Sequence, residues 1–137
     1  MMPGLLTKLG LYEAVEDLLE QIDENTSVNA TCIITGDQDS RLPENKEIML
    51  YRIVQELTNN TLKHAGAENI ELYISIMPGK LDIVYTDDGK GFDYKGKLQS
   101  ESFGLHSMQS RVNFLNGEMN IDSSPGLGVK YTFSIPV

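Results

Sequence analysis

Residues 81–92 read Leu81-Asp82-Ile83-Val84-Tyr85-Thr86-Asp87-Asp88-Gly89-Lys90-Gly91-Phe92, and this stretch decides the fold. Its first half is rich in β-branched and apolar side chains, which predicts a strand that ends at Asp87. A carboxylate there can accept a hydrogen bond from an exocyclic amine such as that of adenine, while Gly89 and Gly91 let the backbone turn sharply and approach a ligand. The stretch therefore indicates the floor of a nucleotide pocket, although a plain turn between two elements also fits these residues.

Length and composition describe one globular domain. The 137 residues suffice for a single buried core, and a hydrophobic content of 40% with a charged content of 23% is ordinary for a soluble chain. No apolar run approaches the roughly 20 residues that span a bilayer, and no signal-peptide pattern opens the sequence. Cys32 is the single cysteine and can form no internal disulfide, which fits a reducing cytoplasm.

The charge is acidic and unevenly distributed. A net charge of −9 argues against nucleic acid as a partner, because phosphate backbones select basic protein faces. Acidic side chains crowd residues 13–24, a pattern that also suits a solvated helix face. Lysines follow the glycine-rich stretch, at Lys90, Lys95 and Lys97. An acidic protein that binds a phosphorylated ligand needs such a local basic rim, together with a metal ion.

Hydrophobic periodicity divides the chain into helices and strands. Helical spacing and its start and stop residues predict helices at 11–22, 43–64 and 105–115. Strand patterns occur at 28–35, 69–77, 80–87, 118–123 and 129–137. The polar segment 93–103 lacks any periodicity and predicts a mobile loop. The expected fold is an α+β two-layer sandwich, a mixed sheet of about five strands with about three helices on one face.

The long predicted helix carries two stripes of side chains. Spacings of three and four residues place four polar groups on one stripe, namely Glu56, Asn60, Lys63 and His64. The adjoining apolar stripe, expected to face the sheet, consists of Leu50, Ile53, Val54 and Leu57. An Asn oxygen suits Mg²⁺, a Glu can orient or deprotonate an attacking group, and a Lys can pair with phosphate. A solvated helix face stabilised by neighbouring pairs is the alternative interpretation of the polar stripe.

Four stretches, in order along nearly the whole chain, resemble the ATP-binding motifs of sensor histidine kinases. They are residues 55–65 (the N box) and 87–93, 103–112 and 124–136 (three glycine boxes). The second glycine box resembles that of the subfamily that pairs with helix-turn-helix response regulators. The fold that this resemblance implies is the Bergerat (GHKL) α/β sandwich, and the cofactors that it implies are ATP and Mg²⁺.

The resemblance also implies roles for individual residues. Asn60 would coordinate Mg²⁺, and Glu56 would orient a metal-bound water or assist proton transfer. Lys63 and His64 would line the phosphates and the ribose, while Asp87 would bind the adenine amino group. Gly89, Gly91 and Phe92 would shape the pocket. Gly104 and Leu105 would place a helix N-terminus near the phosphates. Gly126 and Gly128 would close the side of the pocket that holds the base.

Other features of the chain bear on affinity. The loop 93–103 would be the ATP lid, with its lysines close enough to meet phosphate oxygens. Residues 102–104 read Ser-Phe-Gly where a Gly-x-Gly pattern is common, and Val129 stands after Gly128 where many relatives carry Thr. Both departures predict weaker nucleotide binding without loss of the site.

The acceptor histidine is the missing part of such a kinase. Kinases of this type phosphorylate a histidine on a dimerisation helix, usually before an acidic residue, whereas Ala65 follows His64 and Ser107 follows His106. We therefore expect residues 1–10 to be a linker from a dimerisation domain and 11–137 to be the catalytic domain, which passes the γ-phosphate of Mg-ATP to that domain. The implied partners are this domain, within a homodimeric cytoplasmic or inner-membrane-anchored kinase, and a response regulator, while the isolated domain is expected to be monomeric.

Two other activities suit the same fold. An anti-sigma-factor-type serine kinase would phosphorylate a protein serine, and a nucleotide-sensing interaction module would bind ATP and transfer nothing. The patterns at 3–11 and 104–112 favour the histidine kinase over the serine kinase. Intact Glu56, Asn60 and Asp87 argue against a module without catalysis.

Overall fold

A computed structural model describes residues 4–91, 104–123 and 125–137, apart from the side chains of Leu5, His64 and Ala65. Phe92 and the expected lid at 93–103 lie outside this part of the chain. In order, the helices and strands are α1 (Gly4–Leu9), α2 (Leu11–Asn25), β1 (Asn29–Thr35), α3 (Glu44–Asn60), η1 (Thr61–Ala65), β2 (Asn69–Met77), β3 (Lys80–Asp87), α5 (Leu105–Phe114), β4 (Glu118–Ser123) and β5 (Val129–Pro136).

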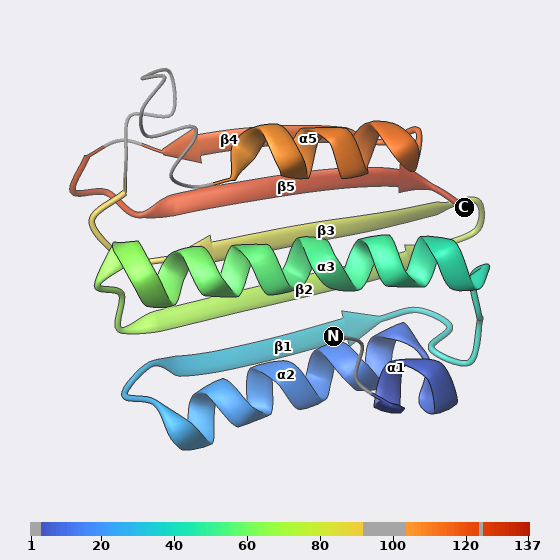
Figure 1. Cartoon of the computed structure of the whole chain (residues 1–137), viewed down its shortest axis with the longest axis horizontal. Coiled ribbons are helices and arrows are strands. Elements are labelled where there is room, and N and C mark those ends of the chain that lie inside the picture. Colours follow the sequence, from blue (N-terminus) through green and yellow to red (C-terminus); the bar gives the residue numbers. More distant parts are fainter. Residues whose placement is uncertain (1–3, 92–103, 124) are drawn as a thin grey trace.

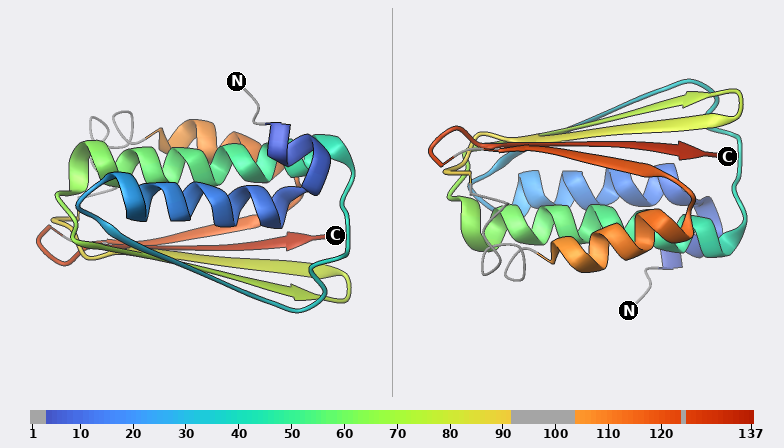
Figure 2. Two further views of the ribbon diagram at one scale, coloured as in Figure 1. Left: turned by 90° about the horizontal axis from the view of Figure 1, so that it is seen from below. Right: turned by 90° about the horizontal axis from the view of Figure 1, so that it is seen from above.

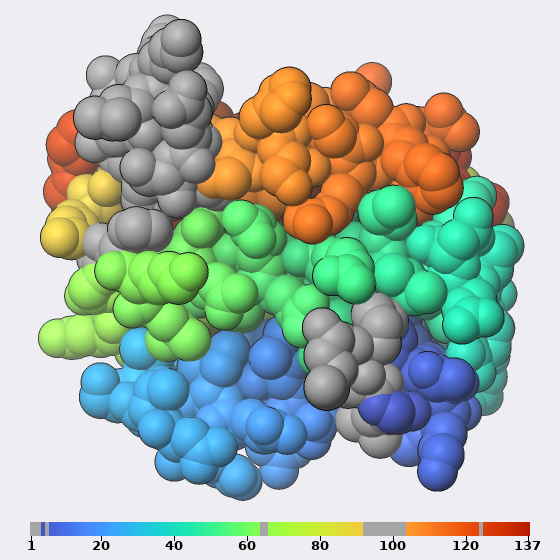
Figure 3. All heavy atoms as spheres, in the orientation of Figure 1, coloured from blue at the N-terminus to red at the C-terminus, as the bar shows by residue number. Residues whose placement is uncertain are grey.

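The strands form one mixed sheet in the order β1-β2-β3-β5-β4. β1 and β2 are parallel, and the other neighbouring pairs are antiparallel. All helices lie on one face of this sheet, with α3 between α2 and α5 (Figures 1 and 2). Figure 3 shows the outer surface of this helical layer, with α3 in green between the blue α2 and the orange α5. The predicted α+β two-layer sandwich is thereby confirmed.

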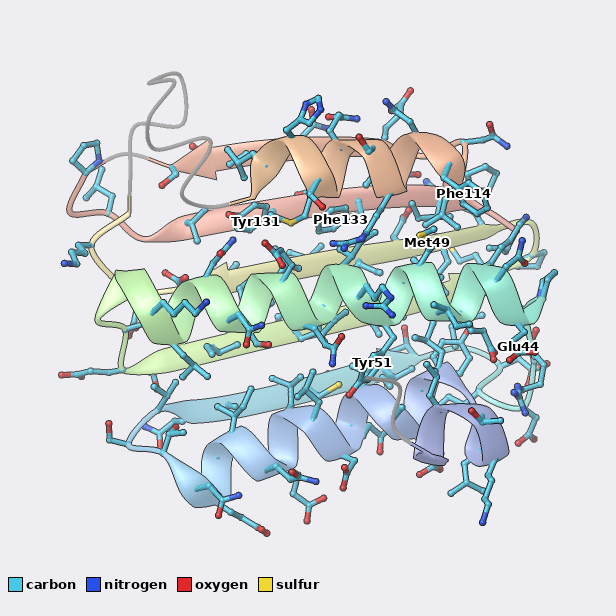
Figure 4. The ribbon with its side chains drawn as sticks, viewed as in Figure 1. Glu44, Met49, Tyr51, Phe114, Tyr131 and Phe133 are labelled. Carbon is cyan, nitrogen blue, oxygen red and sulfur yellow. The ribbon has the colours of Figure 1, made fainter. Side chains whose placement is uncertain are left out.

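The core lies between the helices and the sheet. The predicted apolar stripe of α3 is buried, with Leu50, Ile53, Val54 and Leu57 at most 1% exposed. Tyr131 and Phe133 of β5 are also buried, and Figure 4 shows them between α3 and α5. In β3, burial alternates along the strand so that Leu81, Ile83, Tyr85 and Asp87 share the covered face. Because side chains of a strand alternate between its two faces, Asp87 reaches the core side like the apolar residues before it.

The long helix changes its form at its C-terminal end. The sequence predicted a continuous helix to His64, but the α-helix ends at Asn60 and a π-helical turn, η1, follows. The Thr61 hydroxyl lies 3.2 Å from the carbonyl of Leu57, one turn back. The wider π turn breaks the spacing of three and four residues beyond Asn60, so the predicted polar stripe does not continue as a straight row. Gly66 ends the helix in the left-handed region, with φ of 61°, as predicted.

The N-terminal segment forms a short helix. Residues 1–10 were expected to be a linker, and α1 occupies most of this segment. Leu6 is only 3% exposed and belongs to the core, while Gly10, with φ of 94°, turns the chain into α2. A helix of six residues is unstable in isolation, so packing of Leu6 stabilises it. That this segment leads to a dimerisation domain stays a prediction.

Candidate functional site

Asp87 is a buried carboxylate at the C-terminal end of β3, in the centre of the sheet. Its side chain is held by two hydrogen bonds, since the Thr61 hydroxyl donates to Oδ2 at 2.8 Å and the Gly89 amide donates to Oδ1 at 3.0 Å. Burial raises the pKa of Asp87, the two hydrogen bonds oppose that shift, and the charge of Asp88 adds to it. Asp87 is therefore a preoriented acceptor whose remaining lone pairs can receive a donor from a ligand.

Thr61 connects the long helix to this carboxylate. It is 3% exposed, and its hydroxyl also lies 2.6 Å from that of Tyr85, which is fully buried on β3. No motif in the sequence predicted a role for Thr61 or Tyr85. A signal was present, because Thr61 continues the apolar stripe after Val54 and Leu57 at spacings of three and four. A hydroxyl on a buried stripe needs a buried partner, and that requirement points to a polar contact with the sheet.

Asn60 and Asp87 face the same tyrosine of β5. Asn60, the last residue of α3, is 7% exposed. Burial raises the pKa of Tyr131, the charges of Asp87 and Glu56 add to the shift, and the nearby Asn60 side chain opposes it. Three predicted site residues from the helix and the strand therefore converge on Tyr131.

The second glycine-rich stretch, at Gly104, contacts α3 at Glu56. Gly104, with φ of 64°, precedes α5, and a Cβ atom at this position would overlap Oε1 of Glu56. Leu105, the first residue of α5, is buried and anchors the start of that helix. The backbone N–H groups at an α-helix N-terminus attract anions, so this arrangement places such a terminus beside a half-buried carboxylate.

The third glycine-rich stretch meets the first. The Gly126 amide donates to the carbonyl of Lys90, and Gly128 lies against the backbone of Asp87, where an added Cβ atom would overlap the carbonyl oxygen. Gly128 has φ of 74°, and its carbonyl accepts a hydrogen bond from the Ser123 hydroxyl at 2.9 Å. The two stretches are 40 or so positions apart in sequence and meet because β3 and β5 are neighbouring strands.

Other predicted residues lie differently. Gly91 has φ of 63°, as its predicted turn requires, but Gly89 does not adopt a positive φ and acts through its amide. Lys63 is exposed, while the side chain of His64 and the whole of Phe92 lie outside the described part of the chain. Asp88 accepts hydrogen bonds from the Glu68 and Asn69 amides and so links the end of β3 to the start of β2.

A magnesium ion fits the oxygen groups of this site. Among the residues that the structure describes, no cluster of three His, Cys, Asp or Glu side chains is present. Mg²⁺ does not require such a cage, because it takes one or two protein oxygens and completes its shell with waters and phosphate oxygens. The Asn60 amide and the Glu56 carboxylate, on one helix, are donors of that kind.

Comparison with known proteins decides the family. Residues 45–137 match the family model described as histidine kinase-, DNA gyrase B-, and HSP90-like ATPase. The chain belongs to this ATPase family. The chain is an ATP-binding catalytic domain of the sensor histidine kinase type.

Similar proteins place this ATPase domain among bacterial kinases. It is 37% identical over 132 residues to the signal transduction histidine-protein kinase/phosphatase DegS of Brevibacillus brevis, covering 96% of this chain and 34% of that protein. It is 34% identical over 134 residues to the sensor histidine kinase ComP of Bacillus subtilis, covering 97% of this chain and 17% of that protein. The chain thus spans about a third or less of the length of these relatives.

Solved structures share the fold. The histidine kinase domain of the Erythrobacter litoralis EL346 blue-light activated histidine kinase superposes with a TM-score of 0.71 at 22% identity, covering 93% of this chain and 63% of that one. The catalytic domain of histidine kinase ThkA gives a TM-score of 0.68 at 17% identity, covering 92% and 89%. In the described parts of this chain, no helix has the length and apolarity to cross a bilayer.

Proposed function

We propose that this domain binds Mg-ATP and transfers the γ-phosphate to a histidine on a separate dimerisation domain. The observation that carries the proposal is the buried Asp87 carboxylate, held by two hydrogen bonds at the end of β3, where Gly128 lies against its backbone and Tyr131 responds to Asp87, Asn60 and Glu56. This geometry supports recognition of the adenine amino group, because an ionised carboxylate accepts a hydrogen bond from an amine and repels a carbonyl oxygen.

The residues proposed to contact the phosphates would promote transfer of the γ-phosphate by positioning it and neutralising its charge. Mg²⁺, when bound, supplies positive charge that offsets the developing charge on the phosphates. Asn60 would hold the ion through its amide oxygen, and the N–H groups at the start of α5 would bind phosphate oxygens. Glu56, held against Gly104, would orient the attacking imidazole and take up its proton. Lys63 is exposed at the helix end and would pair with phosphate charge.

The remaining parts of the proposal concern the whole kinase. Residues 1–10, including α1, would connect the domain to the dimerisation helices, and 93–103 would close over the nucleotide as a lid. The phosphate would pass on to a response regulator of the helix-turn-helix class, inside the cytoplasm. The similarity to DegS and ComP, both named as histidine kinases, supports this assignment over a serine kinase.

Calorimetric titration with ATP, with and without Mg²⁺, tests the binding step. The wild-type domain is expected to bind ATP more tightly with Mg²⁺, and Asp87→Asn is expected to lose its preference for ATP over GTP. Absence of ATP binding by the folded wild-type domain would refute the proposal.

Transfer is tested with radiolabelled ATP and a cognate histidine-bearing helix supplied in trans. Asn60→Ala is expected to abolish labelling, whereas Asn59→Ala, an exposed neighbour on the same helix, is expected to retain it. Labelling of a serine, or full activity of Asn60→Ala, would contradict the assigned chemistry.

A further inference from the structure

Three buried groups form a chain of hydrogen bonds from the sheet to the site. The Tyr85 hydroxyl lies 2.6 Å from the Thr61 hydroxyl, which lies 2.8 Å from Oδ2 of Asp87. An ionised carboxylate can only accept, so the single Thr61 proton points to Asp87 and the Tyr85 proton points to Thr61. The Leu57 carbonyl, at 3.2 Å from the Thr61 hydroxyl, is the weaker acceptor because it carries no charge.

These hydrogen bonds determine the orientation of the Asp87 carboxylate. Oδ2 receives Thr61 and Oδ1 receives the Gly89 amide, so both oxygens are held and the plane of the carboxylate is set. On the neighbouring strand the register partner of Asp87 is Val129, which has no hydroxyl to offer. The hydroxyl that orients Asp87 therefore comes from the helix.

We propose that Thr61 is a positioning residue for base selection, which holds Asp87 through the Tyr85–Thr61–Asp87 hydrogen bonds in the orientation that accepts an exocyclic amine. This inference rests on the proposed function, since it assigns a specificity role within the same nucleotide site. Thr61 itself does not have to touch the nucleotide, because it acts through Asp87.

The charge state of Asp87 provides a signature of this role. The groups around it are Asp88 in the following loop, Tyr85 on the same strand, Tyr131 on β5 and Thr61 on the helix. Burial and Asp88 raise its pKa, whereas Thr61 and Gly89 lower it. Loss of the Thr61 hydroxyl removes one of the two stabilising bonds, so the pKa rises further and the carboxyl stays protonated to higher pH. A protonated carboxyl loses an acceptor for the amine.

Thr61→Val and Thr61→Ser form the matched pair of variants, because the first keeps the shape and the second keeps the hydroxyl. Affinities for ATP and GTP are measured by calorimetry from about pH 5 to about pH 8. Thr61→Val is expected to bind ATP roughly tenfold more weakly with unchanged GTP affinity, while Thr61→Ser stays within about twofold of wild type. The acid limb of ATP affinity is expected to move to higher pH in Thr61→Val only.

The outcomes separate the two proposals. Wild-type affinity and an unmoved acid limb in Thr61→Val would overturn the role of Thr61 while leaving ATP binding intact. A wild-type domain that does not bind ATP would instead overturn the proposed function. If Thr61→Val does not fold, the side-chain carboxyl resonance of Asp87 is titrated by NMR in Tyr85→Phe, which removes the donor that polarises the Thr61 hydroxyl and so weakens the hydrogen bond from Thr61 to Asp87. A raised pKa there supports the hydrogen-bond chain, and an unchanged pKa overturns it.

Discussion

The Glu56 carboxylate lies beside Gly104, in the space where any other residue would place its Cβ atom. Two motifs that lie far apart in sequence are thereby brought into contact at the start of α5. The absence of a side chain at position 104 thus leaves room for a group that the proposed chemistry needs.

Gly104→Ala is expected to displace Glu56 and to reduce phosphoryl transfer by tenfold or more, because a positioned acid or base contributes roughly 10²- to 10⁴-fold. The matched control is Gly66→Ala, because Gly66 has nearly the same φ, 61° against 64°, but no atom within 4 Å of the added Cβ. Both variants carry the left-handed strain of about 1–2 kcal/mol, measured by chemical denaturation. Equal transfer rates in the two variants would show that Glu56 is not displaced.

Gly128→Ala is expected to weaken ATP binding and to unfold at lower temperature, because the added Cβ meets the Asp87 carbonyl, a backbone atom that cannot rotate away. Gly126→Ala is the control, since its φ of 82° is equally left-handed but nothing lies within 4 Å. The control should lose only about 1–2 kcal/mol of unfolding free energy. The prediction fails if both variants bind ATP alike.

Asp87→Asn is expected to raise the melting temperature of the empty domain at neutral pH. Burial raises the pKa of Asp87 in the fold, so its carboxyl stabilises the folded state when protonated and loses that contribution as pH rises through the raised pKa. The difference in melting temperature between Asp87→Asn and wild type should therefore vanish in acid, at pH values below the ordinary pKa of aspartate.

Asp88→Asn provides the control of opposite sign. The Asn69 side chain, followed by the Asn69 amide, lowers the pKa of Asp88, so its ionised form stabilises the fold. This variant should melt at lower temperature than wild type near neutral pH, with the difference fading as pH falls. Melting curves that respond to both substitutions in the same direction would contradict the opposite pKa shifts.

Glu47→Gln is expected to lower the free energy of unfolding by about 1–3 kcal/mol, because Glu47 is buried and accepts from the Leu42 amide as well as from Arg41. Glu44→Gln, exposed in the first turn of the same helix, should change it by less than about 0.5 kcal/mol. Urea denaturation distinguishes them, and equal effects would show that the buried contacts of Glu47 contribute nothing.

Cys32 is expected to react slowly with thiol reagents in the folded domain. Burial, with a smaller contribution from Glu16, raises the pKa of this thiol to about 11 from 9.0. At about pH 8 this shift lowers the thiolate fraction roughly a hundredfold, and the thiolate is the reactive form. Labelling with an alkylating reagent should be restored in denaturant, whereas equally fast labelling of the folded domain would exclude the shift.

Sequence patterns predicted most elements because their physical signals are local. All five strands, the stop at Gly66 and the buried stripe of α3 follow from periodicity and from residues that permit or forbid a conformation. α1 was missed as a helix because a six-residue helix has too few internal hydrogen bonds to show a stable period. Its stability depends on the burial of Leu6 against other helices.

The sequence by itself determined that Asp87 ends a strand and faces the core, because side chains on a strand alternate with a period of two. Only the tertiary structure decided what meets it there. Thr61 lies 26 residues away, and its contact with Asp87 depends on the π turn after Asn60 and on how the helix lies across the sheet. Local propensity carries no information about the distance between Thr61 and Asp87, because this distance results from the packing of the whole core.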